Sequence, residues 1–198
     1  MSAAVIPSFT ERHILPPFAS GPTALQPRSP YVVSTEDFIK RFSFSNDRVA
    51  ILKGLLDYRR ALHEAGFVRG FQWLAGSFVE DILRIEEREP RDIDVVTVFL
   101  PPSRYASPEA KRGILELFSA TVNKPKYRCD TYPIDLSIAR EGDLPSLTSL
   151  LAQANYWLGL FSHRRNSEWK GIVQVNLGTV ETDETALNYL QEVGQHGH

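Results

Sequence analysis

The 198-residue chain has a single cysteine, little net charge and no long apolar run. One cysteine, Cys129, can form no disulfide within the chain, so a reducing compartment is expected. The first residues lack the basic start and apolar stretch of a secretory signal, and no segment approaches the ~20 apolar residues of a membrane span. We therefore expect a cytoplasmic protein with no membrane partner. A net charge of −2 shows no overall basic excess of the kind typical of nucleic-acid-binding proteins, and a local basic patch stays open.

Two familiar motif classes are also missing. The sequence contains no Gly-x-x-x-x-Gly-Lys-Ser/Thr string, which excludes a P-loop for nucleotide phosphates. The five histidines and one cysteine show none of the spacings typical of zinc sites. What remains is ordinary for a globular domain of this length, with 42% hydrophobic and 23% charged residues.

Prolines are concentrated at the N-terminus, where residues 1–30 hold six of the 13. This spacing excludes a long helix or a central strand, because proline has a fixed φ and no amide hydrogen. Apolar side chains nevertheless recur there, at Ile6, Phe9, Ile14, Leu15 and Phe18. We interpret residues 1–33 as an extended arm packed on one domain, residues 34–198; a disordered tail is the alternative.

Helix and strand patterns alternate after the arm. The first helix begins with Ser34 as its N-cap. Helices are expected over residues 35–42, 47–65, 78–85, 107–122, 143–161 and 184–193. Strands are expected over residues 67–75, 93–100, 127–132 and 171–177. The alternation predicts an α/β (α+β) fold with a mixed sheet, in which the helix over 107–122 serves as a crossover between two strands.

Two carboxylates stand at the start of the strand IDVVTVFL. Side chains alternate between the faces of a strand, so Asp92 and Asp94 point the same way while Ile93 points into the opposite layer. Like charges this close require a positive partner, and Mg²⁺, which prefers oxygen ligands, suits them. An isolated Asp-x-Asp is more often a solvated strand end, so the interpretation depends on its surroundings.

A Gly-Ser pair supplies those surroundings. Gly76 and Ser77 follow the expected strand FQWLA and precede an expected helix. Glycine allows close approach of the backbone to a ligand, serine offers a hydroxyl, and a helix N-terminus offers free amides. Alone, this would be a plain turn with a serine cap. Together with Asp92 and Asp94, it predicts a site for a metal-bound triphosphate.

The string strand–Gly76–Ser77–helix–Asp92–Ile93–Asp94 resembles the signature of the polymerase-β-like nucleotidyltransferase superfamily. More narrowly, the chain is similar to an uncharacterised group of prokaryotic nucleotidyltransferase-like proteins. The resemblance covers most of the chain, through the segments IPSF…ILPPF, GSFVED…EPRDIDVV, CDTY and YWLGLFSHRR…WKGIVQV. It implies a nucleotidyltransferase-like fold, and the group itself gives no substrate.

The resemblance also implies a third carboxylate on a later strand, and two residues qualify. Asp130 lies inside the expected strand over 127–132, whereas Asp135 follows Pro133, where the strand is expected to end or bend. Asp130 is the preferred third acid for this reason, and Asp135 is the alternative. Tyr132, on the face of Asp130, would either stack on a base or close the core.

With three acids, the resemblance implies that Asp92, Asp94 and Asp130 are catalytic and hold Mg²⁺ or Mn²⁺. Gly76 and Ser77 would bind the phosphates of a nucleoside triphosphate, for which ATP is the expected choice. Arg164 and Lys170 form a cationic cluster that would grip phosphate oxygens or an acceptor; a solvated basic loop is the alternative. The expected reaction transfers AMP to a hydroxyl of an unidentified protein, tRNA or small molecule.

Two other functions stay open at this stage. One is a non-catalytic nucleotide- or partner-binding module of a toxin–antitoxin or phage-defence system, whose protein partner would be encoded nearby. The other is a synthase of a nucleotide signal or short oligonucleotide, for which the chain is short.

Overall fold

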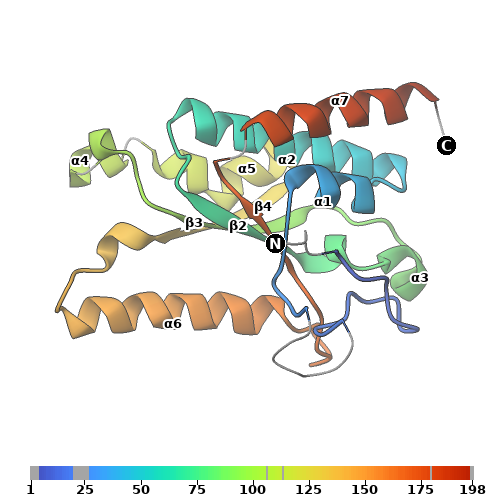
Figure 1. The fold of residues 1–198 in the computed structure, drawn as a ribbon, viewed down its shortest axis with the longest axis horizontal. Helices are drawn as coiled ribbons and strands as arrows, with labels where there is room; N and C mark the ends of the chain where they lie inside the picture. Colours follow the sequence, from blue (N-terminus) through green and yellow to red (C-terminus); the bar gives the residue numbers. More distant parts are fainter. Residues whose placement is uncertain (1–4, 20–26, 106, 113, 179, 197–198) are drawn as a thin grey trace.

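The computed structural model describes residues 5–19, 27–105, 107–112, 114–178 and 180–196, and its centre is a five-stranded sheet (Figure 1). The strands lie in the order β1-β5-β2-β3-β4. Their bounds are Tyr31–Val33 (β1), Gly70–Ala75 (β2), Ile93–Phe99 (β3), Cys129–Asp135 (β4) and Val173–Asn176 (β5). The β1–β5 and β3–β4 pairs are parallel, and β2 runs antiparallel to both β3 and β5. The expected mixed sheet of an α/β fold is confirmed.

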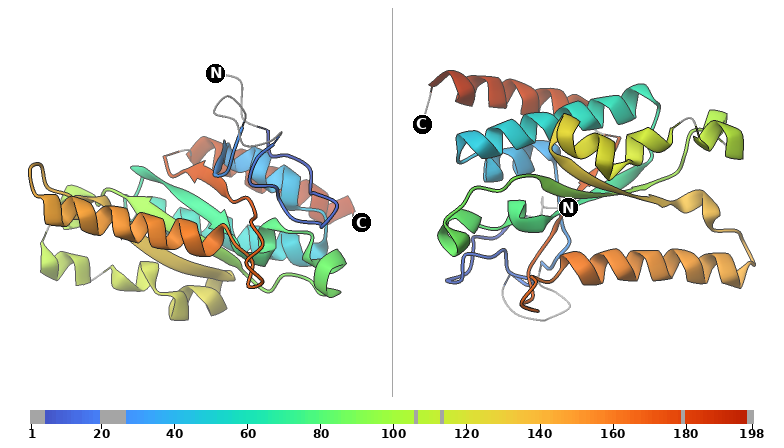
Figure 2. Two further views of the ribbon diagram at one scale, coloured as in Figure 1. Left: turned by 90° about the horizontal axis from the view of Figure 1, so that it is seen from below. Right: turned by 180° about the vertical axis from the view of Figure 1, so that it is seen from behind.

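Helices cover the two faces of the sheet unequally. Four of them pack on one face: α1 (Thr35–Phe42), α2 (Asn46–Glu64), α5 (Ala120–Tyr127) and α7 (Val180–His196). The other face carries α6 (Leu144–Phe161), which runs beneath the sheet in both Figure 1 and the view from behind (Figure 2). The buried residues form two clusters, one on each face, and the larger lies on the side of α1, α2 and α7.

N-cap side chains explain where α1 and α2 begin, and a buried arginine explains how α2 is held. The Ser34 hydroxyl accepts a hydrogen bond from the Asp37 amide at 3.0 Å, so α1 begins at the expected cap. Ser45 caps α2 in the same way through the Arg48 amide. On α2, Arg59 is fully buried and donates to Gln72, Asn176 and Asp183, which ties the helix to the sheet and to α7.

The helix expected over residues 78–85 is wrong. A 3₁₀ turn, η1 (Gly76–Val79), is followed by an extended Glu80 and the short helix α3 (Ile82–Glu86). The Arg48 guanidinium donates to the carbonyls of Phe78 at 2.7 Å and of Glu80 at 2.5 Å. A side chain from α2 thus takes acceptors that a continuous helix would give to its own amides.

The crossover between β3 and β4 is also divided. In place of one helix over 107–122, the chain forms α4 (Pro108–Arg112), the 3₁₀ turn η3 (Leu115–Phe118) and then α5, with the 3₁₀ turn η2 (Ser103–Tyr105) before them. The side-chain amide of the buried Asn123 donates to the Leu117 carbonyl at 2.8 Å, and Ser119 is extended. The crossover role itself is confirmed, because β3 and β4 are parallel neighbours.

Other boundaries also differ from expectation, and β2, for example, begins at Gly70 and not at residue 67. Strand β4 continues through Pro133 to Asp135; this is tolerated because β4 is an edge strand, where a missing amide hydrogen costs little. Residues 31–33, assigned to the arm, form β1 and pair with β5. The last helix is longer than residues 184–193. In the described part of the chain, no helix combines the length and apolar character needed to cross a bilayer.

Described parts of the arm pack against the remainder of the chain. Ile6, Ile14 and Leu15 are buried in its described part. The Gly171 amide donates to the Leu15 carbonyl at 2.6 Å, and the Asp81 amide donates to the His13 carbonyl at 2.9 Å. The arm therefore lies beside α3 and the segment before β5 (Figure 1).

Candidate functional site

The sheet register brings the predicted acids to one rim. Ala75, the last residue of β2, pairs with Asp94 on β3, and Asp94 pairs with Asp130 on β4. Residues paired in register on adjacent strands present their side chains on the same face. Asp92 precedes Asp94 by two residues and stands at the mouth of β3. The Gly-Ser turn and the three carboxylates thus lie together, with Asp94 in the middle.

Gly76 makes close contact with Asp94 possible. Its φ is +79°, a conformation that favours glycine, and an added Cβ would lie 2.1 Å from Asp94 Oδ2. Any larger residue here would push the carboxylate away. Ser77 follows in η1 and is partly exposed. Because η1 is a single 3₁₀ turn, the long helix N-terminus expected as a phosphate cradle is replaced by the Gly76–Ser77 turn alone.

A lysine that sequence reasoning missed joins the outer acids. Lys124, on α5, places its ammonium 2.8 Å from Asp92 Oδ2 and 2.9 Å from Asp130 Oδ2. Its side chain is half exposed, and both hydrogen bonds raise its pKa. Sequence spacing gave no signal for this contact, because Lys124 reaches the rim only once the crossover has folded back onto β4.

Asp94 lies in an unfavourable electrostatic environment. Burial is the main cause that raises its pKa to about 6, and the negative charges of Asp92 and Asp130 add to the effect. Lys170 and Lys124 act in the opposite direction but do not cancel it. A carboxylate in this position binds either a proton or a further cation more readily than an exposed aspartate does.

The donor chemistry of the rim suits a hard divalent cation. Three carboxylates flank a glycine turn, and two of them already share one positive charge. Within the described residues, however, no three His, Cys, Asp or Glu side chains converge as a ready metal-binding set. Asp92 and Asp130 are instead drawn to the Lys124 ammonium, so an incoming metal ion requires this lysine to move.

Asp135, the alternative third acid, lies far from the rim along the strand. Its partner on β3 is Phe99, at the opposite end from Asp94. The Asp135 carboxylate accepts a hydrogen bond from the Ser137 amide at 2.8 Å and caps the 3₁₀ turn η4 (Leu136–Ile138). The register therefore places Asp130, and not Asp135, beside Asp94. The break at Pro133, which was the reason to prefer Asp130 from the sequence, does not exist.

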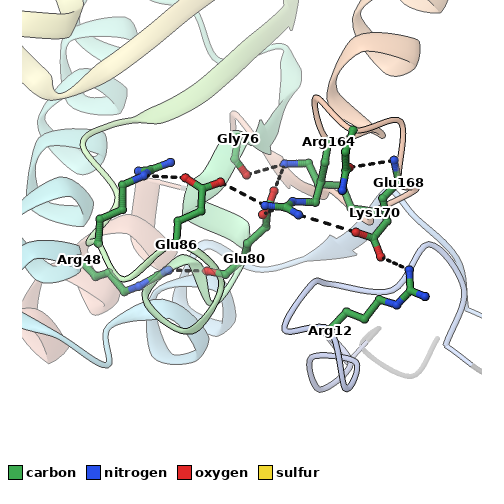
Figure 3. A network of polar contacts seen from close by, with 10 residues as sticks. Arg12, Arg48, Gly76, Glu80, Glu86, Arg164, Glu168 and Lys170 are labelled. Atoms are coloured by element: carbon green, nitrogen blue, oxygen red, sulfur yellow. Dashed lines mark hydrogen bonds and ion pairs between the residues drawn. The ribbon is translucent and has the colours of Figure 1, made fainter.

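Arg164 and Lys170 lie in a network of ion pairs beneath the Gly76 turn (Figure 3). Lys170 is buried and donates to the Gly76 carbonyl at 2.8 Å and to Glu80 Oε1 at 2.5 Å. Arg164 donates to Glu80 Oε2 at 2.9 Å and contacts Glu86 and Glu168. Glu80, a buried carboxylate that sequence reasoning did not single out, is the common partner.

In this network both cations make contacts within the chain. The network supports the backbone of the Gly76 turn from below, and Arg12 of the arm joins it through Glu168 at 3.0 Å (Figure 3). The predicted phosphate-binding role of Arg164 and Lys170 stays a prediction. Any such role has to be reconciled with their ion pairs to Glu80.

Tyr132 extends the rim toward α6. It lies two residues after Asp130 on β4, and its ring packs on Trp157 with 4.2 Å between centroids and on Phe161 with 5.8 Å. Burial and the neighbouring Asp130 charge raise its pKa. Of the two sequence interpretations of Tyr132, this geometry supports core closure.

Comparison with known proteins identifies a family but no activity. Residues 7–176 match a family of unknown function (DUF6932), and this range includes most of the arm, the rim and all five strands. No curated protein matches the chain. No solved structure matches it either.

Proposed function

Because the chain belongs to this family of unknown function, membership supplies no activity, and we propose one from its own side chains: a Mg²⁺- or Mn²⁺-dependent nucleotidyltransferase. The proposed reaction transfers a nucleoside monophosphate, AMP from ATP in the first instance, to an acceptor hydroxyl. Under this proposal, the Gly76 turn and the acids of β3 and β4 are the parts of the fold that correspond to a nucleotidyltransferase.

One observation carries the proposal. The register Ala75–Asp94–Asp130 puts a glycine turn and carboxylates from two parallel strands side by side, with Asp92 at the edge. This arrangement is costly as a purely structural feature, because burial and the negative charges of Asp92 and Asp130 raise the pKa of Asp94 and disfavour its ionised form. Costly ionisable clusters of this kind concentrate at functional sites.

The residues of the rim would have separate roles in the reaction. Asp92 and Asp94 would hold the metal ion with the triphosphate, while the Gly76–Ser77 turn approaches the phosphates. The metal ion supplies charge neutralisation for the phosphates and for the pyrophosphate that leaves. Asp130, on the open edge strand, would orient the acceptor hydroxyl and accept its proton at a carboxylate oxygen. An oxygen–phosphorus bond forms at the α-phosphate as the bond to pyrophosphate breaks.

The two aspartates of β4 provide the test. ATP labelled at the α-phosphate would be incubated, with Mg²⁺ or Mn²⁺, with the protein alone, with tRNA and with cell extract. Asp130→Asn should abolish label transfer, with the loss in kcat rather than KM, because the acceptor is engaged mainly in the transition state. Asp135→Asn is the matched control on the same strand and should transfer normally. Equal effects of the two substitutions would reject the proposal.

A second candidate is a non-catalytic nucleotide- or partner-binding module. The observation in its favour is Lys124, which neutralises Asp92 and Asp130 within the chain as a structural ion pair would. On this alternative the wild-type protein binds ATP or a protein partner and transfers label to no acceptor. A toxin–antitoxin or phage-defence setting belongs to this candidate, and a nucleotide-signal synthase remains a variant of the first.

A further inference from the structure

We propose that Lys124 makes the acidic rim select a metal–triphosphate complex over the free metal ion. The inference rests on the proposed function and concerns the specificity of the same site. Its starting point is the position of the Lys124 ammonium, which contacts Asp92 and Asp130 at 2.8 and 2.9 Å.

The helix that carries Lys124 is held by buried contacts, whereas the lysine side chain is half exposed. The buried Asn123 side chain donates to the Leu117 carbonyl and to the Thr131 hydroxyl, at 2.8 and 2.9 Å. The Tyr127 carbonyl lies so close to Gly54 on α2 that a Cβ there would be 2.1 Å away. Lys124 itself is 51% exposed. Its ammonium can leave the acids by side-chain rotation while α5 stays in place.

A free divalent ion would have to displace this ammonium without offering it a new partner. The acids would exchange one positive partner for another, and the lysine would remain tethered next to the ion as a like charge. The other lysine near Asp94, Lys170, cannot take over, because it is committed to Glu80 and the Gly76 carbonyl. Lys124 therefore weakens the binding of the bare ion.

Lys124 weakens the binding of the bare ion but strengthens the binding of a metal–triphosphate complex. The complex carries net negative charge, so an ammonium displaced from Asp92 and Asp130 meets phosphate oxygens within reach of its flexible stem. The same lysine then contributes to binding. A purely structural ion pair, in contrast, would oppose any ligand that breaks it, because such a pair gains nothing when it is opened.

Removing the Lys124 charge should weaken the binding of the metal–triphosphate complex if Lys124 is selective, and strengthen it if the ion pair is purely structural. Both outcomes can be measured by binding alone, without catalysis. Calorimetric titrations would use Mn²⁺ alone and Mn²⁺ with α,β-methylene-ATP, whose bridging carbon prevents nucleotidyl transfer. Lys124→Met keeps an unbranched side chain that is one atom shorter and removes its charge. We expect it to bind Mn²⁺ alone about tenfold more tightly and the Mn²⁺–nucleotide complex about tenfold more weakly, each the size of one modest charge contact.

Two variants serve as controls. Lys126→Met removes the same charge from the same helix, at a residue whose ammonium lies over the Tyr127 ring, and should leave both affinities unchanged. Lys124→Arg retains the charge and should preserve the wild-type preference. Thermal unfolding in a chelator checks that each variant is folded, and Lys124→Gln replaces Lys124→Met if the latter is not.

The outcomes separate this inference from the function on which it rests. Wild-type protein that binds neither probe contradicts the proposed function, and the inference with it. Wild-type protein that binds both probes, with Lys124→Met changing the two affinities in the same direction or not at all, contradicts the inference alone. Opposite changes confined to Lys124→Met support it.

Discussion

Asp94 shows how a single residue can lower the stability of the fold that contains it. Asp94 is paired in register with Asp130, its carboxylate occupies the space that a side chain at Gly76 would need, and it is only partly exposed. Burial raises its pKa from 3.8 to about 6, so the folded protein holds this proton more tightly than the unfolded chain does. Stability should therefore fall as the pH rises from about 4 through 6.

Asp94→Asn should remove that pH dependence. At pH 8 the variant should be more stable than the wild type by up to roughly 3 kcal/mol, the equivalent of about two pKa units, and at pH 4 the two should be nearly equal. Urea denaturation at both pH values, without divalent ions, measures the difference. Asp57→Asn, at an exposed carboxylate on α2, controls for the loss of a charge. A stabilisation of the same size at both pH values would show that ionisation is not the cause.

Between elements, Lys170 joins the segment before β5 to the Gly76 turn. Its ammonium bridges the Gly76 carbonyl and the buried Glu80 carboxylate, which Arg164 contacts from the other side. Lys170→Met leaves a buried carboxylate with one cation in place of two. It should lower the free energy of unfolding by about 3 kcal/mol, as when one partner of a buried pair is removed.

A double-mutant cycle identifies the origin of this loss. Adding Glu80→Gln to Lys170→Met should recover part of the stability, because the uncompensated charge is then gone. Chemical denaturation of the four proteins gives the coupling energy. A lysine that serves only to bind phosphate would behave differently: its removal would leave stability unchanged and weaken nucleotide binding.

Elements whose signals are local could be predicted from the sequence, and those shaped by distant side chains could not. The Ser34 cap fixed the start of α1, and the apolar run of β3 identified a buried strand. The helix expected after Ser77 is interrupted because Arg48, about 30 residues earlier in the chain, takes the carbonyls of Phe78 and Glu80. Strand β1 has three residues and forms only because β5 pairs with it.

For the molecule as a whole, topology decided which parts of the site could be foreseen. Asp92 and Asp94 share a face by strand alternation, a local rule, and the structure places them at one rim. The position of Asp130 beside Asp94 depends on the parallel register of β3 and β4, which the sequence did not fix. The contacts of Lys124 and Glu80 depend on how the crossover and the segment before β5 fold back onto the sheet. No spacing in the sequence predicts these contacts.

Described residues of the arm contact the segment before β5 and the ion-pair network below the Gly76 turn. Leu15 is fully buried in the larger core cluster, its carbonyl accepts from Gly171, and Arg12 reaches the ion-pair network through Glu168. The sequence division at residue 33 therefore marks a change in composition. Since both Leu15 and Lys170 hold the segment before β5, loosening the arm should also loosen support for the Gly76 turn.

Leu15→Ala tests whether the arm and the domain unfold together. Truncating a fully buried leucine should lower the free energy of unfolding by about 3 kcal/mol, because it loses apolar contacts and leaves a cavity. Val5→Ala, at a residue of the arm that is 77% exposed, should change it by less than about 0.5 kcal/mol. Chemical denaturation followed by tryptophan fluorescence reports the whole fold, since Trp73 lies in the sheet and Trp157 on α6. One transition shifted as a unit is expected; an unchanged main transition would mean that the arm folds independently and contributes nothing to the stability of the rim.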